Sequence, residues 1–181
     1  MLVLLFSIRV VGDGNPANYT FIYLNIQINM LLRYKMLAEN LKVLLASTQV
    51  FAIKLQQFHW CVEGRDFPQY HAFYDVFYNE VSDTLDKIAE YIRILGHYTP
   101  GSLQRYSELT IIQDQTKIPR AELMFQETLA DIEKMTELVI TMFDVATNER
   151  QQGIANFMAE LQDLYGKKAW MVRSILKVER E

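Results

Sequence analysis

Residues 68–96 read PQYHAFYDVFYNEVSDTLDKIAEYIRILG, and this stretch decides the fold class of the 181-residue chain. It opens on Pro68, which suits the first turn of a helix, and closes on Gly96, which suits the position just after one. Apolar side chains recur three or four residues apart, as on one face of an α-helix, at Phe73, Val76, Phe77, Val81, Leu85, Ile88 and Ile92. The stretch therefore predicts a long helix over about 68–95.

The same helical periodicity recurs elsewhere in the chain. Residues 31–60 contain neither glycine nor proline, and their apolar side chains again lie mostly three or four positions apart. Further helices are predicted from about Pro119 to Thr147 and from about Gln151 to Val178, with a short helix near 106–112 in the connection before them. Four long helices predict an all-α, four-helix bundle, and the long second-to-third connection allows a crossover.

The composition agrees with a single helical domain. Glycine and proline together make up 11 of the 181 residues, against roughly 12% in an average protein, which argues against a turn-rich β-sandwich or barrel. The single cysteine, Cys61, excludes an internal disulfide and a thiolate zinc site, and it favours a reducing, cytoplasmic compartment. With only three histidines in the chain, any metal site must rely on carboxylates.

The net charge of −4 is unevenly distributed. Residues 1–58 carry five basic and two acidic side chains, or +3, which leaves −7 for the remainder. A negative field repels the phosphates of nucleic acids and attracts metal cations. Neither end of the chain has a lysine-rich tail, because the first 30 residues contain only Arg9 as a basic residue and the C-terminus mixes both signs. The sequence therefore argues against direct DNA binding at physiological salt.

Residues 1–29 differ from the rest and are interpreted as an N-terminal extension of unknown role, preceding a bundle domain over residues 30–181. The apolar run 1–6 is far shorter than the roughly 20 residues that span a bilayer, so no membrane segment is expected. Residues 12–16 form a turn cluster, and residues 22–30 alternate between apolar and polar as in a β-strand. The alternatives are an appended strand, a loose arm, or upstream sequence before a translation start at Met30 or Met36.

A stripe of polar side chains runs along the helix predicted over 68–95. At 100° per residue and with His71 at zero, Asp75 lies at about 40°, Asp86 at about 60° and Glu90 at about 100°. His71 and Asp75 are four residues apart, as are Asp86 and Glu90, so each pair can reach one cation. Imidazole and carboxylate together suit iron or manganese. For either pair alone, an ordinary solvated polar face is the alternative.

The two pairs cannot hold one metal within a single chain. Asp75 and Asp86 are 11 residues apart, which is about 16 Å along a helix that rises 1.5 Å per residue. If this helix packs antiparallel on its copy, His71 and Asp75 of one chain face Asp86 and Glu90 of the other, and two-fold symmetry makes two equivalent sites. Ser82 lies near the midpoint of the stripe and is small enough to allow close approach. This spacing predicts a metal site shared between two chains.

His59 lies at the end of the first predicted helix, 12 residues before His71 and ahead of the break at Gly64 and Pro68. The reversal of the chain between the two histidines lets His59 fold back toward His71. A packed or capping histidine is the more common alternative for such a residue.

The residues and their spacing resemble the signature of the Dps proteins, which are mini-ferritins of the ferritin-like superfamily. The resemblance covers roughly residues 31–178. It rests on Gln57-Phe58-His59-Trp60, Gly64, Asp66-Phe67, His71, Asp75, Asp86, Glu90, Leu95-Gly96, Pro100-Gly101-Ser102-Leu103, Tyr106, Leu109-Thr110 and Lys168-Ala169-Trp170-Met171-Val172-Arg173.

The resemblance implies a hollow dodecamer of ferritin-like bundles. It also implies a ferroxidase centre between two-fold-related chains, with His59, His71 and Asp75 from one chain and Asp86 and Glu90 from its partner. Fe²⁺ would be bound there as a di-iron pair, oxidised preferentially by hydrogen peroxide and stored as ferric mineral, which protects against oxidative damage. The same ligands accept zinc or manganese.

The resemblance also implies a place for Trp60 beside the iron, where an aromatic ring intercepts stray oxidising equivalents, and packing in the core is its alternative. Two other readings of the whole chain stay open. One is a DNA-compacting protein with little ferroxidase activity, which the charge disfavours. The other is a helical assembly protein whose polar stripe is only an interface.

Overall fold

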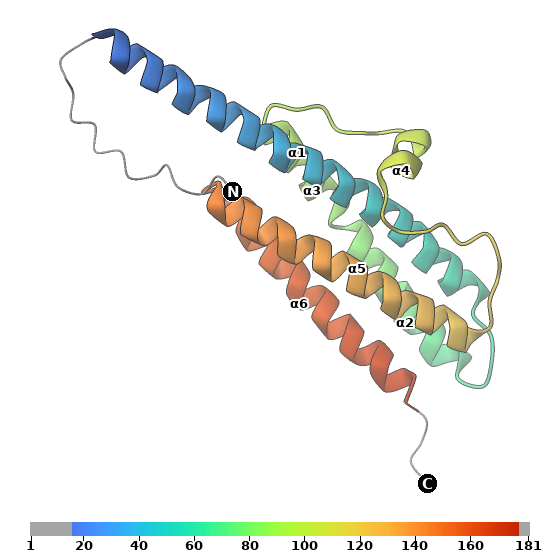
Figure 1. Ribbon diagram of the computed structural model, residues 1–181. Coiled ribbons are helices and arrows are strands. Elements are labelled where there is room, and N and C mark those ends of the chain that lie inside the picture. The colour runs from blue at the N-terminus through green and yellow to red at the C-terminus, as the bar shows by residue number, and fades with distance from the viewer. Residues whose placement is uncertain (1–15, 178–181) are drawn as a thin grey trace.

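The structure, a computed structural model, describes the backbone of residues 16–177 and the side chains of residues 35–177 (Figure 1). Its helices are α1 (Pro16–Cys61), α2 (Phe67–Ser82), α3 (Leu85–Ile94), α4 (Leu103–Leu109), α5 (Ala121–Asn148) and α6 (Gln152–Ile175). Between residues 16 and 177 there is no β-strand. The predicted all-α four-helix bundle is confirmed, with α1, α2 continued by α3, α5 and α6 as its long members.

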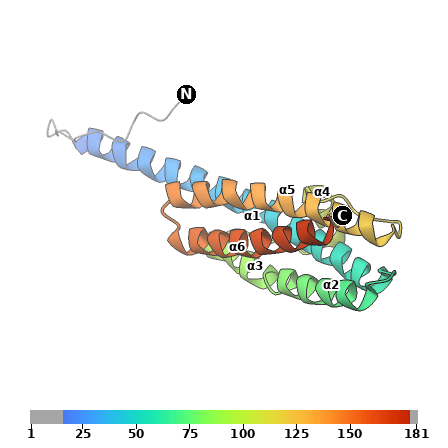
Figure 2. The ribbon, with the colours of Figure 1, turned by 90° about the horizontal axis from the view of Figure 1, so that it is seen from below.

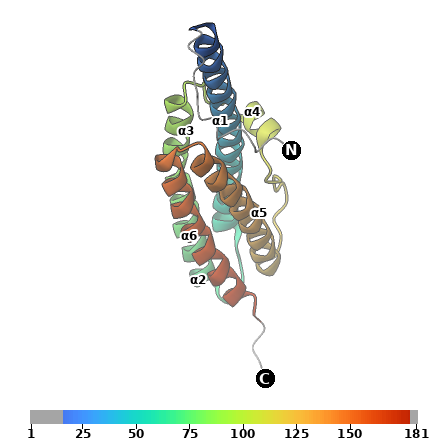
Figure 3. The same cartoon turned by 60° about the vertical axis from the view of Figure 1, so that its left-hand side comes forward.

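The connection from α3 to α5 crosses the length of the bundle, so the crossover that the long connection allowed is present (Figures 1 and 3). The connection contains α4 and then runs beside α1. The Ile111 amide donates to the Ser47 hydroxyl at 3.1 Å, and the Gln57 side-chain amide donates to the Lys117 carbonyl at 3.4 Å. These two hydrogen bonds hold the connection against α1.

The helix predicted over 68–95 is interrupted at Asp83 and Thr84, which separate α2 from α3. The Ser82 hydroxyl donates to the Tyr78 carbonyl and the Thr84 hydroxyl to the Val81 carbonyl, each at 2.7 Å. Serine and threonine side chains that bond to the preceding turn compete with the backbone ladder, which explains the local break. Asp83 and Thr84 keep right-handed helical backbone angles, so α3 continues in the direction of α2 (Figure 2).

The strand expected over residues 22–30 is wrong, because α1 begins at Pro16 and is one helix of 46 residues. No glycine or proline follows Pro16 before Trp60, and adding a turn to an existing helix is far easier than starting a new element. The N-terminal part of α1 projects beyond the other helices (Figures 1 and 2). The predicted apolar run 1–6 and residues 12–15 of the turn cluster lie outside the described residues.

Two other boundaries differ from the prediction by about three residues. The short helix α4 begins at Leu103 instead of near 106, because the Ser102 hydroxyl caps it by accepting a bond from the Arg105 amide at 3.3 Å. Helix α6 ends at Ile175, before the predicted end at Val178, which lies outside the described residues.

The core is aliphatic around residues 37–46 of α1 and aromatic toward the C-terminal end of this helix. The Phe51 ring meets the Phe77 ring edge-on with centroids 5.6 Å apart, and Tyr165 of α6 lies 6.5 Å from Phe51. The segment Lys35–Cys61 of α1 is long and apolar enough to cross a membrane, but 56% of its most apolar window is buried inside the bundle. That burial identifies this part of α1 as the core helix of the fold.

Candidate metal centre

The turn between α1 and α2 brings the two predicted histidines together. Gly64 has φ +125°, a backbone conformation that residues other than glycine rarely adopt. The Phe67 amide donates a hydrogen bond to the Gly64 carbonyl at 3.2 Å. Pro68 then occupies the first turn of α2, where its missing N–H costs nothing. This tight reversal places the last turn of α1 against the first turn of α2.

His59 and His71 pair through both their rings and their main chains. The two imidazole rings are stacked, with centroids 3.8 Å apart and planes 25° apart. His59 Nδ1 lies 3.0 Å from the His71 carbonyl oxygen, and His71 Nδ1 lies 2.8 Å from the His59 carbonyl oxygen. The prediction that His59 folds back toward His71 is confirmed.

These reciprocal bonds assign the tautomer of both rings. A carbonyl oxygen only accepts, so each Nδ1 donates its hydrogen, and in the neutral ring the lone pair is then on Nε2. Metal-bound histidines in proteins use this arrangement, in which the bond at one ring nitrogen orients the other toward the ion. The Nε2 atoms of His59 and His71 are therefore two candidate metal ligands on neighbouring rings.

Asp75 supplies a carboxylate next to this pair. Its Oδ1 lies 3.9 Å from His59 Nε2, and its side chain is 52% exposed. Asn79, one turn later on α2, donates to the Asp75 carbonyl at 2.8 Å and reaches Asp75 Oδ1 at 3.5 Å. Asp75 thus lies beside His59, on which the His71 ring is stacked, and imidazole and carboxylate are donor types that suit iron.

Asp86 and Glu90 lie on α3, exposed and apart from the histidines. Among the side chains of residues 35–177, no group of three or more His, Cys, Asp or Glu is close enough to enclose a metal ion. Nor does either carboxylate have an ion-pair partner within that part of the chain. One chain therefore presents the candidate ligands in two separate groups, one on α2 with His59 and one on α3.

Large apolar side chains flank the candidate ligands and are exposed. Trp60 follows His59 and is 67% exposed, Val76 follows Asp75 and is 51% exposed, and Phe67, 43% exposed, has its ring 5.1 Å from that of His71. The alternative that Trp60 packs in the core is therefore wrong for the single chain. An apolar rim around charged and imidazole ligands is typical of a surface that another protein covers.

Tyr78 is a neighbour of the site that the sequence reasoning missed. Its ring centroid lies 5.4 Å from that of His59, and its side chain is half-buried. The available signal was its position, because Tyr78 is three residues after Asp75 and so lies on the same side of α2.

Comparison with known proteins agrees with the fold. A family model for the ferritin-like domain matches residues 38–181. The chain is 28% identical over 142 residues to "DNA protection during starvation protein 2" of Bacillus anthracis. The matched region covers 78% of this chain and 97% of that protein.

Solved structures give the same result. The crystal structure of Dps from Staphylococcus aureus has a TM-score of 0.76 at 28% identity, covering 79% of this chain and 96% of that one. Dps from Vibrio cholerae, described as a member of the ferritin-like diiron-carboxylate superfamily, has a TM-score of 0.78 at 23% identity, covering 81% and 92%.

Proposed function

The chain belongs to the Dps family of the ferritin-like superfamily, and from this premise we propose that it is a ferroxidase that oxidises Fe²⁺ and stores ferric mineral in a hollow dodecamer. The observation that carries the proposal is the pairing of His59 with His71 next to Asp75: each Nδ1 bonds to a main-chain carbonyl, and His59 Nε2 lies 3.9 Å from the exposed Asp75 carboxylate. These residues bind iron on one side of the proposed centre.

The remaining ligands come from a second copy of the chain. An antiparallel pairing of two α2–α3 faces sets His71 and Asp75 of one protomer against Asp86 of the partner subunit and Glu90 of the partner subunit. The exposed apolar rim of Trp60, Phe67 and Val76 supports such a pairing, because these side chains lose contact with water only when a second surface covers them.

The ligand mixture suits oxidation of Fe²⁺ as the substrate. Carboxylates stabilise Fe³⁺ and bridge two ions, imidazole tunes the affinity for Fe²⁺, and five protein ligands leave positions open for water and hydrogen peroxide. Two Fe²⁺ ions give one electron each to one hydrogen peroxide molecule, which takes up two protons and leaves as two molecules of water. Both reagents of hydroxyl-radical chemistry, Fe²⁺ and hydrogen peroxide, are thereby removed together.

The proposal is tested by the rate of Fe²⁺ oxidation with hydrogen peroxide, followed by the absorbance of ferric products. We expect the double change Asp86→Ala and Glu90→Ala to slow the reaction by at least about tenfold, since even outer partners of metal ligands are worth 10–100-fold. Asp163→Ala, an exposed carboxylate on α6, is the matched control and should leave the rate unchanged. A wild-type rate equal to that in buffer would refute ferroxidase activity.

The second candidate function is DNA compaction, which the name of the Bacillus anthracis relative suggests. The net charge of −4 disfavours it. A gel-shift assay at moderate salt separates the two functions, and we expect no shift of the DNA. A measurement of the particle mass together with its iron content separates both from a plain helical assembly protein.

A further inference from the structure

Many ferritin-like di-iron proteins bind metal inside the bundle, through carboxylates and histidines that project inward from facing helices. The interior of this bundle holds charged residues of a different kind. Among the side chains of residues 35–177, the charged ones that are buried are Lys54, Asp131 and Lys168, with 4%, 3% and 3% exposure. Two of the three are cations.

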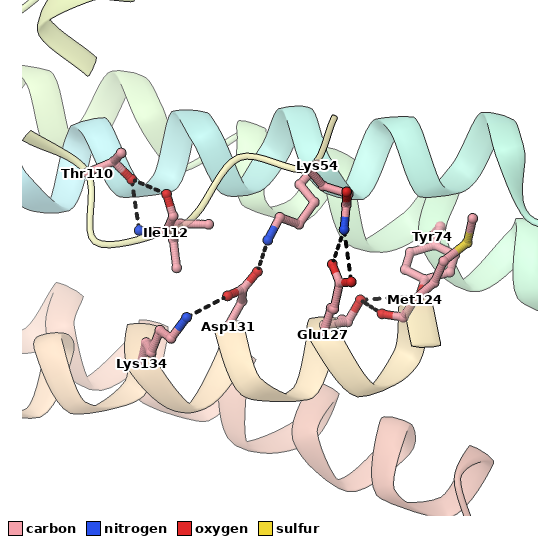
Figure 4. Close-up of polar contacts among 10 residues, drawn as sticks. Lys54, Tyr74, Thr110, Ile112, Met124, Glu127, Asp131 and Lys134 are labelled. Atoms are coloured by element: carbon pink, nitrogen blue, oxygen red, sulfur yellow. Dashed lines mark hydrogen bonds and ion pairs between the residues drawn. The ribbon is translucent and has the colours of Figure 1, made fainter. Parts of the chain in front are cut away.

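Lys54 of α1 reaches across the bundle to Asp131 of α5. Its Nζ lies 2.6 Å from Asp131 Oδ2, while Lys134 Nζ lies 3.2 Å from the other oxygen, Oδ1 (Figure 4). Both oxygens of the buried carboxylate are therefore bonded to an ammonium group. A metal ion at Asp131 would have to displace or approach these two ammonium groups, whose positive charges repel it.

Glu127 lies one turn before Asp131 on α5 and points toward α1 as well (Figure 4). Carboxylates four residues apart on a helix can reach one cation, which makes this pair the strongest candidate for an interior metal site. Both Glu127 oxygens, however, accept bonds from the Gln115 side-chain amide at 2.9 Å. Nitrogen donors of the chain itself thus engage all four oxygens of the pair.

A second ammonium lies between α6 and α2. Lys168 Nζ is 2.5 Å from Glu80 Oε2, and it lies 5.0 Å and 5.6 Å from the ring centroids of Phe77 and Phe73. The aromatic faces and the carboxylate hold the charge in the core. Each of the two buried lysines therefore neutralises a carboxylate of a facing helix.

We propose that Lys54 is a specificity-determining residue, which excludes divalent metal from the carboxylates of the bundle interior and confines it to the proposed site at His59, His71 and Asp75. A buried carboxylate requires a positive charge nearby, and an ammonium group provides it without an open coordination position. The inference goes beyond the proposed function and does not depend on ferroxidase activity, because it concerns only where a divalent ion binds.

The test uses Co²⁺ as the probe on the full-length protein. We expect Lys54→Glu to bind about one more Co²⁺ per chain than the wild type, with a new visible absorption band and a Co²⁺-dependent rise in melting temperature. The added change Asp131→Asn should remove the extra ion. Lys167→Glu, the same change of charge at an exposed position beside Lys168, is the matched control and should add no buried ion.

Lys54→His is a second variant that adds a metal ligand without adding a buried negative charge.

Extra Co²⁺ in either folded variant supports the proposal. Folded variants without extra Co²⁺ would overturn it, as would variants that stay unfolded at saturating Co²⁺, because the metal would then be unable to replace the ammonium. A loss of bound Co²⁺ in Asp131→Asn alone would overturn it too, since the wild-type interior would already hold metal. A wild type that binds no Co²⁺ at all would contradict the proposed function. The proposal about Lys54 would still be decided by whether Lys54→Glu binds more Co²⁺ than the wild type.

Discussion

The imidazole rings of His59 and His71 are stacked 3.8 Å apart, and each ring bonds through Nδ1 to the main-chain carbonyl of the other residue. One pair of residues thus closes the turn between α1 and α2 and aims two ring nitrogens outward. In each ring, Nδ1 makes the structural bond and Nε2 is the candidate metal ligand. A substitution that keeps one nitrogen and removes the other therefore separates the effect on stability from the effect on metal binding.

His71→Asn retains a nitrogen donor near the position of Nδ1 and removes Nε2. We expect this variant to lose at least about tenfold in Co²⁺ affinity, while its free energy of unfolding stays within about 1 kcal/mol of the wild type. His71→Ala loses both atoms and should be the less stable of the two by about 0.5–1.5 kcal/mol. Calorimetric titration and urea unfolding measure the two quantities. His97→Ala, the remaining histidine, is the control that should change neither.

A centre shared between chains makes a prediction for mixed assemblies. One variant lacks His71 and Asp75, and the other lacks Asp86 and Glu90, so neither forms a complete site alone. A mixed dimer has one intact site of two, and random mixing makes half of the dimers mixed, which restores about a quarter of the wild-type rate of Fe²⁺ oxidation. The two proteins are unfolded together, refolded and assayed against the separately refolded variants. Equal inactivity in all three samples would contradict a shared site.

Two buried tyrosines predict sensitivity to alkali. Burial raises the pKa of Tyr74 far above its usual value near 10, against a smaller lowering by its bond to Thr128, and burial likewise raises the pKa of Tyr165. A raised folded-state pKa means that stability is fully present below pH 10 and is lost as the pH rises further, by up to about 1.4 kcal/mol per pH unit and residue.

We expect Tyr74→Phe to flatten the fall of the unfolding free energy between about pH 10 and 12, because the unfolded chain then has one phenol fewer to ionise. Urea unfolding at stepped pH measures the slope. Tyr98→Phe, at a side chain that is 83% exposed, is the control and should leave the slope unchanged. An unchanged slope in Tyr74→Phe would show that this residue does not link folding to pH.

Local periodicity was sufficient to predict the bundle, because each long helix buries one apolar stripe that repeats in the sequence. It also placed His71, Asp75, Asp86 and Glu90 on one side of the second helix. The same reasoning was wrong over residues 22–30, where an alternating pattern competed with a helix already extending from the core. Local pattern alone does not decide between two elements when the neighbouring segment already has a structure.

Periodicity carried no signal for the interior charges. Lys54 and Asp131 are 77 residues apart and meet only because α1 packs on α5, and each reads in sequence as an ordinary polar position of a helix. The main-chain bonds of His59 and His71 were hidden for a similar reason, since they depend on the angle of the turn at Gly64. Such contacts follow from tertiary packing, which the local pattern of a sequence does not encode.

Removal of residues 1–29 is expected to leave the fold, the assembly and the iron chemistry intact. Among the described side chains, the buried core begins at Leu37, and every proposed ligand lies between His59 and Glu90, so a chain that begins at Met30 retains all of these contacts. We expect its melting temperature to stay within about 2 °C of the full-length value, consistent with the small effect of changes outside the packed core. Native mass measurement gives the assembly, and Fe²⁺ oxidation with hydrogen peroxide gives the activity. A smaller particle at the same rate would assign residues 1–29 to assembly, whereas a lost rate in an unchanged particle would place part of the iron site in the extension and contradict the proposed ligand set.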